Sequence, residues 1–119
     1  MKRNWDIIRN IMLWLESGSP NGAPDGIDDK EFMYHVKLLM DKNLITDCEV
    51  QRFINGGELL LGCPRLTFDG HEFLDNIRHD NPWAKTKSWL AKFSGDVSFS
   101  VVSELAAKAT KTFIMSVID

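Results

Sequence analysis

The chain has 119 residues, 14 of them basic and 17 acidic, with a formal net charge of −3 and an apolar fraction of 44%. This length fits one domain with a packed core, and the mild acidity gives no support to nucleic-acid binding by charge alone. No stretch reaches the ~18 uncharged apolar residues that span a bilayer, and charged residues interrupt the first apolar run, so the sequence predicts a cytoplasmic protein without a signal peptide or a membrane partner.

The first predicted helix covers residues 4–16. One apolar stripe recurs there at helical spacing, and two further apolar side chains widen it. The stripe contains Ile8, Ile11, Met12 and Leu15, and the wider face adds Ile7 and Trp14. A face of this width predicts contacts on two sides.

Residues 17–26 are rich in Gly, Pro, Ser, Asn and Asp, which is typical of turns. A complete winged helix usually has a short strand and a second helix at this point. The segment is too short and too polar for a full helix. The sequence therefore predicts a second helix that is abbreviated or merged with the start of the next one.

The next helix begins near Asp29 and is the centre of the predicted fold. Asp28 or Asp29 can cap its start, and Glu31 stands at the spacing of a capping box. Its apolar face consists of Phe32, Val36, Leu39 and Met40. We expect the helix to end near Asn43, which tolerates a left-handed backbone, and to lead directly into a strand.

Residues 44–65 lose the helical period and predict a two-stranded antiparallel hairpin around an Asn-Gly-Gly turn at residues 55–57. Pro64 either ends the second strand or stands where no ladder donor is required. Cys48 and Cys63 fall on opposite arms of this hairpin. They are interpreted as two small buried residues, with a disulfide as the alternative.

The segment after the hairpin predicts a further helix, with Thr67 as its cap. Its apolar side consists of Phe73, Leu74 and Ile77. Gly70 in the first turn costs about 1 kcal/mol relative to alanine, which indicates that another element passes close to it. We expect the helix to stop around residues 80–81, because Pro82 disfavours helical geometry at the residue before it.

Two more helices are predicted, at residues 82–93 with Pro82 in the first position, and from Ser98 or Ser100 to Ile118. The first has Trp83, Leu90 and Phe93 on one face with Trp89 beside them, and the second has Val102, Ala106, Ala109, Phe113 and Val117. The fold class is therefore mainly α with a small antiparallel β-hairpin. It is read as a winged helix-turn-helix domain at residues 1–80 and a C-terminal helical extension packed on it at residues 81–119.

With these stretches in view, the chain resembles a family of small uncharacterised proteins from bacteria and their prophages, known only as a domain of unknown function. The resemblance rests on the Met-Lys-Arg start, on residues 34–39 and 44–45, and above all on the Leu-Thr-x-x-Gly-His-Glu-Phe-Leu segment at residues 66–74. The family has Gly where this chain has Asn43. The resemblance implies a winged-helix fold and a phage or prophage setting. It implies no established activity, so it transfers no functional residue.

DNA is the first candidate partner. Lys30, Tyr34 and Lys37 lie opposite the apolar face of the central helix, and Arg52 stands near the tip of the hairpin, where these side chains can meet phosphates or base edges. Against this, residues 25–65 contain five basic and eight acidic residues, and the central helix has no arginine to bind guanine. These cations can equally be solvated side chains.

A protein partner is the alternative, in which the chain inhibits or adapts a host protein, for example as an anti-defence protein. The last helix carries Ala106, Ala107 and Ala109, small residues that permit close approach, followed by Phe113, Ile114 and Met115. It either packs within the chain or pairs with a second copy in a homodimer.

The sequence predicts no catalytic residue, no metal ligand and no cofactor. His35, His71 and His79 are the only obvious general bases, and a buried histidine bonded to backbone, with His35 near Asp69 or Glu72, is preferred to a catalytic one. No spacing typical of metal ligands or of a phosphate loop occurs. The aromatic group at Trp83, Trp89 and Phe93 is interpreted as core, although Trp89 is the candidate for exposure and base stacking.

Overall fold

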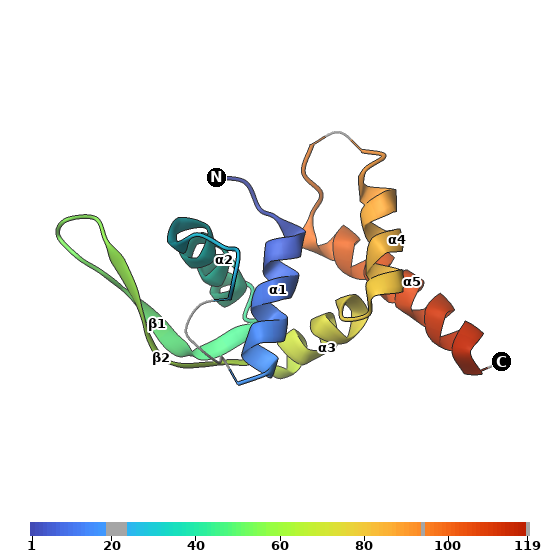
Figure 1. Ribbon diagram of the computed structural model, residues 1–119, viewed down its shortest axis with the longest axis horizontal. Helices are drawn as coiled ribbons and strands as arrows, with labels where there is room; N and C mark the ends of the chain where they lie inside the picture. Colours follow the sequence, from blue (N-terminus) through green and yellow to red (C-terminus); the bar gives the residue numbers. More distant parts are fainter. Residues whose placement is uncertain (19–23, 94, 119) are drawn as a thin grey trace. The chain divides into compact units, whose positions relative to one another are not determined.

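A computed structural model describes residues 1–18, 24–93 and 95–118. These residues form five helices and one two-stranded antiparallel sheet (Figure 1). The elements are α1 (Trp5–Glu16), α2 (Asp29–Asp41), β1 (Ile45–Arg52), β2 (Glu58–Leu66), α3 (Phe68–Ile77), α4 (Asp80–Leu90) and α5 (Phe99–Ile118). The mainly helical fold with one hairpin is confirmed, and the order of α1, α2 and the hairpin is compatible with a winged helix. None of the described helices has an apolar stretch long enough to span a membrane.

The chain divides into two compact units, Met1–His71 and Glu72–Asp119, and each has its own buried apolar residues. The division falls within α3. The proposed boundary after residue 80, with the extension packed on the first domain, stays a prediction. Residues 19–23, the middle of the predicted turn-rich loop, lie outside the described residues.

In the first unit, α1 packs against α2 and β2. Asn4 caps α1 because its side-chain oxygen accepts hydrogen bonds from the backbone N–H groups of Asp6 and Ile7. The predicted stripe is buried, and it consists of Ile8, Ile11, Met12 and Leu15. On the second side of the helix, the ring of Trp14 meets that of Phe32 edge-on, with the centroids 5.7 Å apart. The wide apolar face predicted for this helix is therefore in contact with α2.

Helix α2 is capped as predicted, since the Asp28 carboxylate accepts the N–H of Glu31 at 2.9 Å. This hydrogen bond lowers the pKa of Asp28. Phe32, Val36 and Leu39 are buried, but Met40 is only half-buried, and the fully buried His35 completes the inner face instead. The helix gives way to the strand at Asn43, whose φ of 61° is the left-handed conformation expected of it.

Strands β1 and β2 pair from Ile45 with Leu66 to Arg52 with Glu58. The ladder is irregular between Thr46 and Cys48, where the intervening Asp47 adopts a φ of 63°. Pro64 lies in this irregular stretch and the strand continues past it, so the second of the two explanations for Pro64 is the correct one.

Both cysteines are free thiols, so the alternative of a disulfide is wrong. The expectation that both are buried is also wrong, because Cys63 is exposed and only Cys48 is half-buried. Burial raises the pKa of the Cys48 thiol, and the neighbouring Asp47 carboxylate adds to this effect.

Hydrogen bonds connect the turn after α2 to the start of α3. The Thr67 hydroxyl donates to the carbonyl of Asn43 at 2.7 Å and accepts the N–H of Gly70 at 3.0 Å, while the Thr67 N–H donates to the Leu44 carbonyl at 3.0 Å. A methyl group on Gly70 would collide with that same Leu44 carbonyl oxygen. The cap at Thr67 and the close approach at Gly70 are thus both confirmed.

In the second unit, three helix boundaries differ from the prediction, namely the end of α3 and both ends of α4. Helix α3 already ends at Ile77, and α4 begins at Asp80, with Pro82 as its third residue rather than its first. Any position in the first helical turn tolerates proline, because no N–H in that turn has a partner within the helix. Trp83 is buried as expected, but Phe93 lies beyond the end of α4 and is exposed.

Helix α5 begins after Ser98, whose hydroxyl accepts the N–H of Val101 at 3.3 Å. Val102, Ala106 and Ala109 are buried, and α5 packs against α4. The Thr110 hydroxyl donates to the Asn76 carbonyl at 2.8 Å. The rest of the predicted apolar stripe is not buried within the chain, because among the described residues after Thr110 none is buried, Phe113 is half-buried and Val117 is 67% exposed.

Candidate functional site

The predicted DNA-contacting residues of α2 have different environments. Lys30 is exposed, whereas Tyr34 and Lys37 are half-buried. The Tyr34 ring stands edge-on to the ring of the buried His35, with the centroids 5.1 Å apart. The Tyr34 side chain therefore packs against a residue of the buried face of α2. Lys30 and Tyr34 are one helical turn apart, and Lys37 follows at the next turn along the same side.

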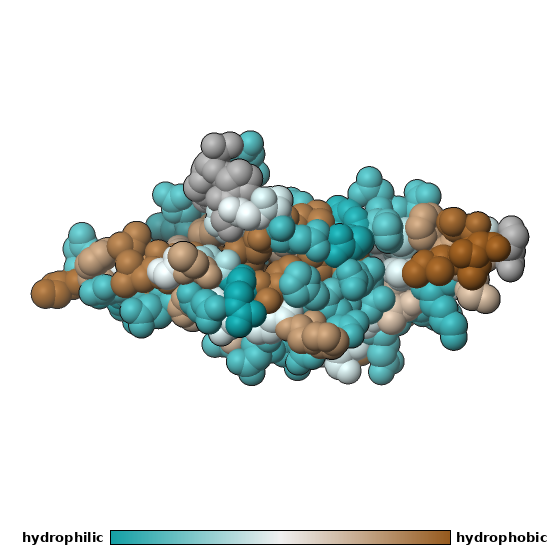
Figure 2. All heavy atoms as spheres, turned by 90° about the horizontal axis from the view of Figure 1, so that it is seen from below, coloured by the Kyte–Doolittle hydropathy of each residue, from teal (hydrophilic) through white to brown (hydrophobic). Residues whose placement is uncertain are grey.

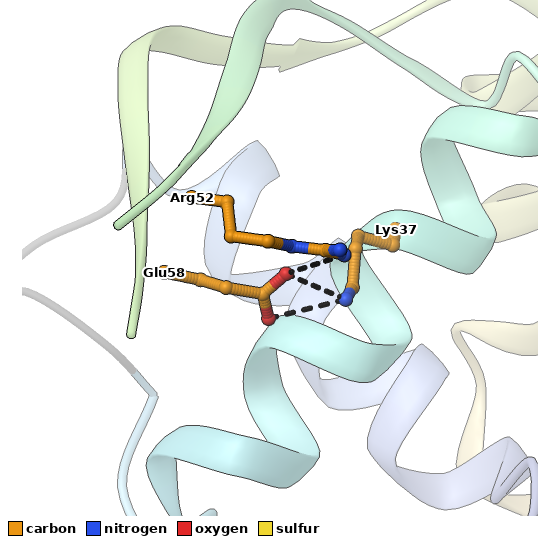
Figure 3. Close-up of polar contacts among 3 residues, drawn as sticks. All are labelled: Lys37, Arg52 and Glu58. Atoms are coloured by element: carbon orange, nitrogen blue, oxygen red, sulfur yellow. Dashed lines mark hydrogen bonds and ion pairs between the residues drawn. The ribbon is translucent and has the colours of Figure 1, made fainter. Parts of the chain in front are cut away.

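Lys37 of α2 and Arg52 of β1 meet at one carboxylate, that of Glu58 at the start of β2 (Figure 3). The Lys37 ammonium donates to both carboxylate oxygens, at 2.8 and 3.1 Å. The nearer Arg52 nitrogen lies 3.5 Å from one of these oxygens, which makes a looser ion pair. Three elements therefore contribute one side chain each to a single charged cluster.

The Glu58 side chain is the least accessible member of this cluster, with 19% of its surface exposed, against 38% for Lys37 and 73% for Arg52. The hydrogen bonds from Lys37 lower the pKa of Glu58, and Arg52 lowers it further. Glu58 is therefore ionised at neutral pH and cancels one of the two positive charges. The cationic surface is smaller than the sequence predicted.

A shallow hollow lies beside this cluster. It is lined by Lys37, Met40, Asp41, Val50, Arg52 and Glu58. Its lining carries two positive side chains, Lys37 and Arg52, and two negative ones, Asp41 and Glu58, and its apolar members are Met40 and Val50.

Sequence reasoning missed Glu58. The signal for half of the cluster was present, because a hairpin that turns at residues 55–57 brings Arg52 opposite Glu58 in the strand register. The contact with Lys37 depends on how the hairpin leans on α2, and no spacing in the sequence encodes that angle.

The tip of the hairpin is apolar and exposed. Phe53 is 45% exposed, Leu59 48%, and Ile54 is fully exposed. Figure 2 shows hydrophobic side chains gathered at this end of the hairpin and again at the end of α5. The turn itself is held by the Phe53 N–H, which donates to the Gly57 carbonyl at 2.8 Å. These apolar side chains are therefore presented to solvent by an ordered turn.

The histidines offer no rival site. His35 is fully buried, its Nε2 accepts the Asn4 N–H at 2.8 Å, and its Nδ1 lies 2.7 Å from the Glu31 carbonyl oxygen. Both ring nitrogens thus bond to backbone as predicted, rather than to the carboxylates of Asp69 or Glu72. His71 and His79 are exposed, and among the described residues no three His, Cys, Asp or Glu side chains gather as metal ligands.

The aromatic candidates for base stacking are dispersed. Trp89 is half-buried, and the ammonium groups of Lys85 and Lys108 each lie 5.7 Å from its ring centroid. Its accessible surface is thus shared with two lysine side chains. Trp83 is buried and Phe93 is exposed, so the three rings do not form one stacking platform.

Comparison with known proteins gives a family without an assigned role. Residues 2–96, which contain every element except α5, match a family described as "Hypothetical protein (DUF2513)". A protein of Haemophilus influenzae described as "Uncharacterized protein" is 39% identical over 113 residues, which cover 89% of this chain and 92% of that protein. No solved structure matches the chain.

Proposed function

The chain belongs to the DUF2513 family of hypothetical proteins, and on that premise we propose that it is a DNA-binding protein, a phage- or prophage-associated transcriptional regulator of the winged-helix type. Helix α2 and the hairpin together would contact the duplex. The single observation that carries this proposal is that Lys37 from α2 and Arg52 from β1 meet at one carboxylate on a partly exposed surface. The phage setting comes only from the sequence resemblance.

The dimensions of α2 suit this role. Its 13 residues make a helix of about 20 Å, which fits lengthwise in a major groove about 12 Å wide. Lys30, Tyr34 and Lys37 repeat along one side of it, away from the buried Phe32 and Leu39. Arg52 then extends the same contact surface onto the hairpin, as a wing does beside a recognition helix.

Charge limits the strength of such binding. Lys30, Lys37 and Arg52 can neutralise at most about three phosphates, which predicts a slope of log affinity against log salt of about −2.7. A rise from ~50 to ~200 mM salt should then weaken binding about 40-fold. Because α2 contains no arginine, any base-specific contact must be made by Tyr34, Lys30 or Lys37.

The test is a fluorescence titration of a random-sequence duplex with wild-type protein and with the Lys30→Ala/Lys37→Ala variant at several salt concentrations. We expect the variant to bind more weakly and its salt slope to flatten by about 1.8. The matched control is Lys92→Ala/Lys111→Ala, which removes the same charge from two exposed positions of the second unit. Absence of wild-type binding at ~50 mM salt would end the proposal, and equal effects of the two variants would mean that α2 is not the contact surface.

A second candidate function, a module that inhibits or adapts a host protein, is favoured by the hairpin tip. Phe53, Ile54 and Leu59 expose apolar surface that a phosphate backbone cannot cover, whereas a cleft on a protein can. The check is a pull-down from host lysate with wild-type protein and with Ile54→Lys. A protein partner of this tip must be enriched by the wild type and lost with the variant, and retention by both would exclude the tip.

A further inference from the structure

We propose that Lys37 and Arg52 form a phosphate-binding subsite, and that the Glu58 carboxylate occupies this subsite while no ligand is bound. Glu58 is then an intramolecular competitor of the incoming phosphate. This inference rests on the proposed DNA-binding function and adds a residue that regulates it. The ligand chemistry is a phosphate group, either a phosphodiester of a duplex or a free phosphate ion.

The donors are already arranged around an anion. The Lys37 ammonium contacts both oxygens of the Glu58 carboxylate, at 2.8 and 3.1 Å, and the Arg52 guanidinium approaches one of them at 3.5 Å. Ammonium and guanidinium groups that converge on carboxylate oxygens from two elements can offer the same donors to phosphate oxygens. A ligand therefore needs no new side-chain positions on α2 or β1, only the departure of the carboxylate.

Accessibility favours this exchange. Arg52 and Lys37 expose 73% and 38% of their side chains, so a phosphate can approach both from solvent. The looser Arg52 contact leaves most of the five guanidinium N–H donors without a Glu58 oxygen within reach. Glu58 is the first residue of β2, next to the turn, where its side chain can swing aside without a change in the buried core. Ion pairs of this accessible kind contribute little to stability, so their loss opposes ligand binding only weakly.

The alternative role for Glu58 is purely structural, in which its carboxylate fixes the two cations in place for DNA. The two roles predict opposite effects of the same substitution. If Glu58 competes, then Glu58→Gln frees two cations and binding becomes tighter. If Glu58 only positions Lys37 and Arg52, its loss loosens both and binding becomes weaker.

The experiment compares wild-type protein, Glu58→Gln and the control Glu49→Gln in the same duplex titration. Glu49 is an exposed glutamate of β1, so its substitution removes the same charge from the hairpin without touching the Lys37–Arg52 pair. We expect Glu58→Gln to bind about threefold more tightly at ~50 mM salt, which is the size of effect that an accessible ion pair has. Its salt slope should stay close to that of the wild type, because the same three cations meet the phosphates. Glu49→Gln should give a distinctly smaller gain, and Lys37→Ala added to Glu58→Gln should abolish the gain.

Equal gains in Glu58→Gln and Glu49→Gln, or a loss in Glu58→Gln, would overturn the inference while leaving DNA binding by the wild type intact. If no variant binds a duplex, the proposed function fails together with it. Glu58→Thr, which keeps a side chain suited to a strand, is the second variant in case the glutamine protein folds poorly. Its gain should match that of Glu58→Gln.

The source of the phosphate is distinguished by adding inorganic phosphate, with chloride at matched ionic strength as reference. Displacement of the duplex by phosphate beyond the chloride effect, larger in Glu58→Gln than in wild type, assigns the subsite to free phosphate as well. Equal displacement by both salts assigns it to the phosphodiester backbone.

Discussion

Gly70 shows what the sequence can and cannot predict about the surroundings of one residue. A glycine in the first turn of a helix costs stability, so its presence predicted a close neighbour. The neighbour is the Leu44 carbonyl, which accepts the Thr67 N–H and lies where the side chain at position 70 would begin. The sequence predicted that something approaches Gly70 but not what, since the partner lies 26 residues earlier and is a backbone atom.

We expect Gly70→Ala to destabilise the protein, although alanine is the better helix former by about 1 kcal/mol. The added methyl group must push the Leu44 carbonyl away, and overpacking of this kind costs about 1–3 kcal/mol. Urea unfolding monitored by circular dichroism measures the difference. Ser88→Ala, at an exposed position of α4, serves as control and should change stability by less than about 0.5 kcal/mol. Equal or higher stability of Gly70→Ala would show that the turn after α2 adjusts freely.

His35 illustrates the same limit. Its burial and its bonds to backbone were predictable, because a histidine beside an apolar stripe must satisfy both ring nitrogens. Glu31, one turn earlier in α2, is a local partner. The second partner is the N–H of Asn4, 31 residues away at the cap of α1, and no local pattern reveals it. Since Asn4 donates to Nε2, the ring proton resides on Nδ1 and is donated to the Glu31 carbonyl.

At the scale of elements, the sequence predicted correctly those helix ends that a single residue defines, by a side-chain cap or a left-handed backbone. Asn43 ends the α2 region in a left-handed conformation, and Ser98 and Thr67 cap the helices that follow them. The predicted start of α4 at Pro82 was wrong, and the helix begins at Asp80. Proline is compatible with any of the first three positions of a helix, and the sequence alone does not choose among them. The position of the turn implies which residues of the two strands lie opposite each other. Nothing in the sequence implies the contact between the hairpin and α2.

The Glu58 ion pairs join the hairpin to α2, and their contribution to stability should depend on pH. The pKa of Glu58 is lower in the folded protein, chiefly because of the hydrogen bonds from Lys37, so the folded state holds this proton less tightly than the unfolded state does. The stabilisation is therefore fully present above the ordinary glutamate pKa. It is lost as the pH falls through the lowered pKa of the folded state.

We expect Glu58→Gln to be less stable than the wild type at neutral pH, with a difference that shrinks steadily as the solution is acidified below the ordinary glutamate range. Urea midpoints of both proteins across this range provide the measurement. Glu49→Gln, on the exposed face of the hairpin, is the control and should show no comparable convergence. A difference that stays constant down to strongly acid pH would mean that the carboxylate charge is not what joins the two elements.

For the molecule as a whole, the net charge follows directly from the sequence, whereas the positions of the charged side chains relative to one another could not be predicted from it. The excess of acidic residues was visible at once, whereas the ion pairs that Lys37 and Arg52 both form with one glutamate were not. The same holds for apolar residues. The apolar stripe of α5 was predicted to reach Val117, with packing inside the chain and pairing with a second copy left open. Burial within the chain stops at Thr110, and only the three-dimensional arrangement shows this.

The end of α5 leads to a last prediction, that two copies of the chain associate there. Residues 112–118 contain no charged side chain, and Ile114, Met115, Val117 and Ile118 are 47–69% exposed. Apart from Phe113, whose ring lies 5.4 Å from that of His79, these side chains are exposed, and two helical turns with so little packing are marginally stable in water. An antiparallel pair of such ends would cover the same apolar side chains in both copies. Light scattering should give a mass that rises with concentration from 13.6 kDa towards twice that value.

The substitutions that test this association lie on one side of the helix end. Met115→Lys/Ile118→Lys should keep the protein at the mass of one chain, because each pair would then bury charged ammonium groups. Val101→Lys is the control, since Val101 is also exposed, at 43%, but lies at the other end of α5. It should leave the association unchanged. A wild-type mass that is independent of concentration would contradict the prediction, and the apolar end of α5 would then be solvated in a monomer.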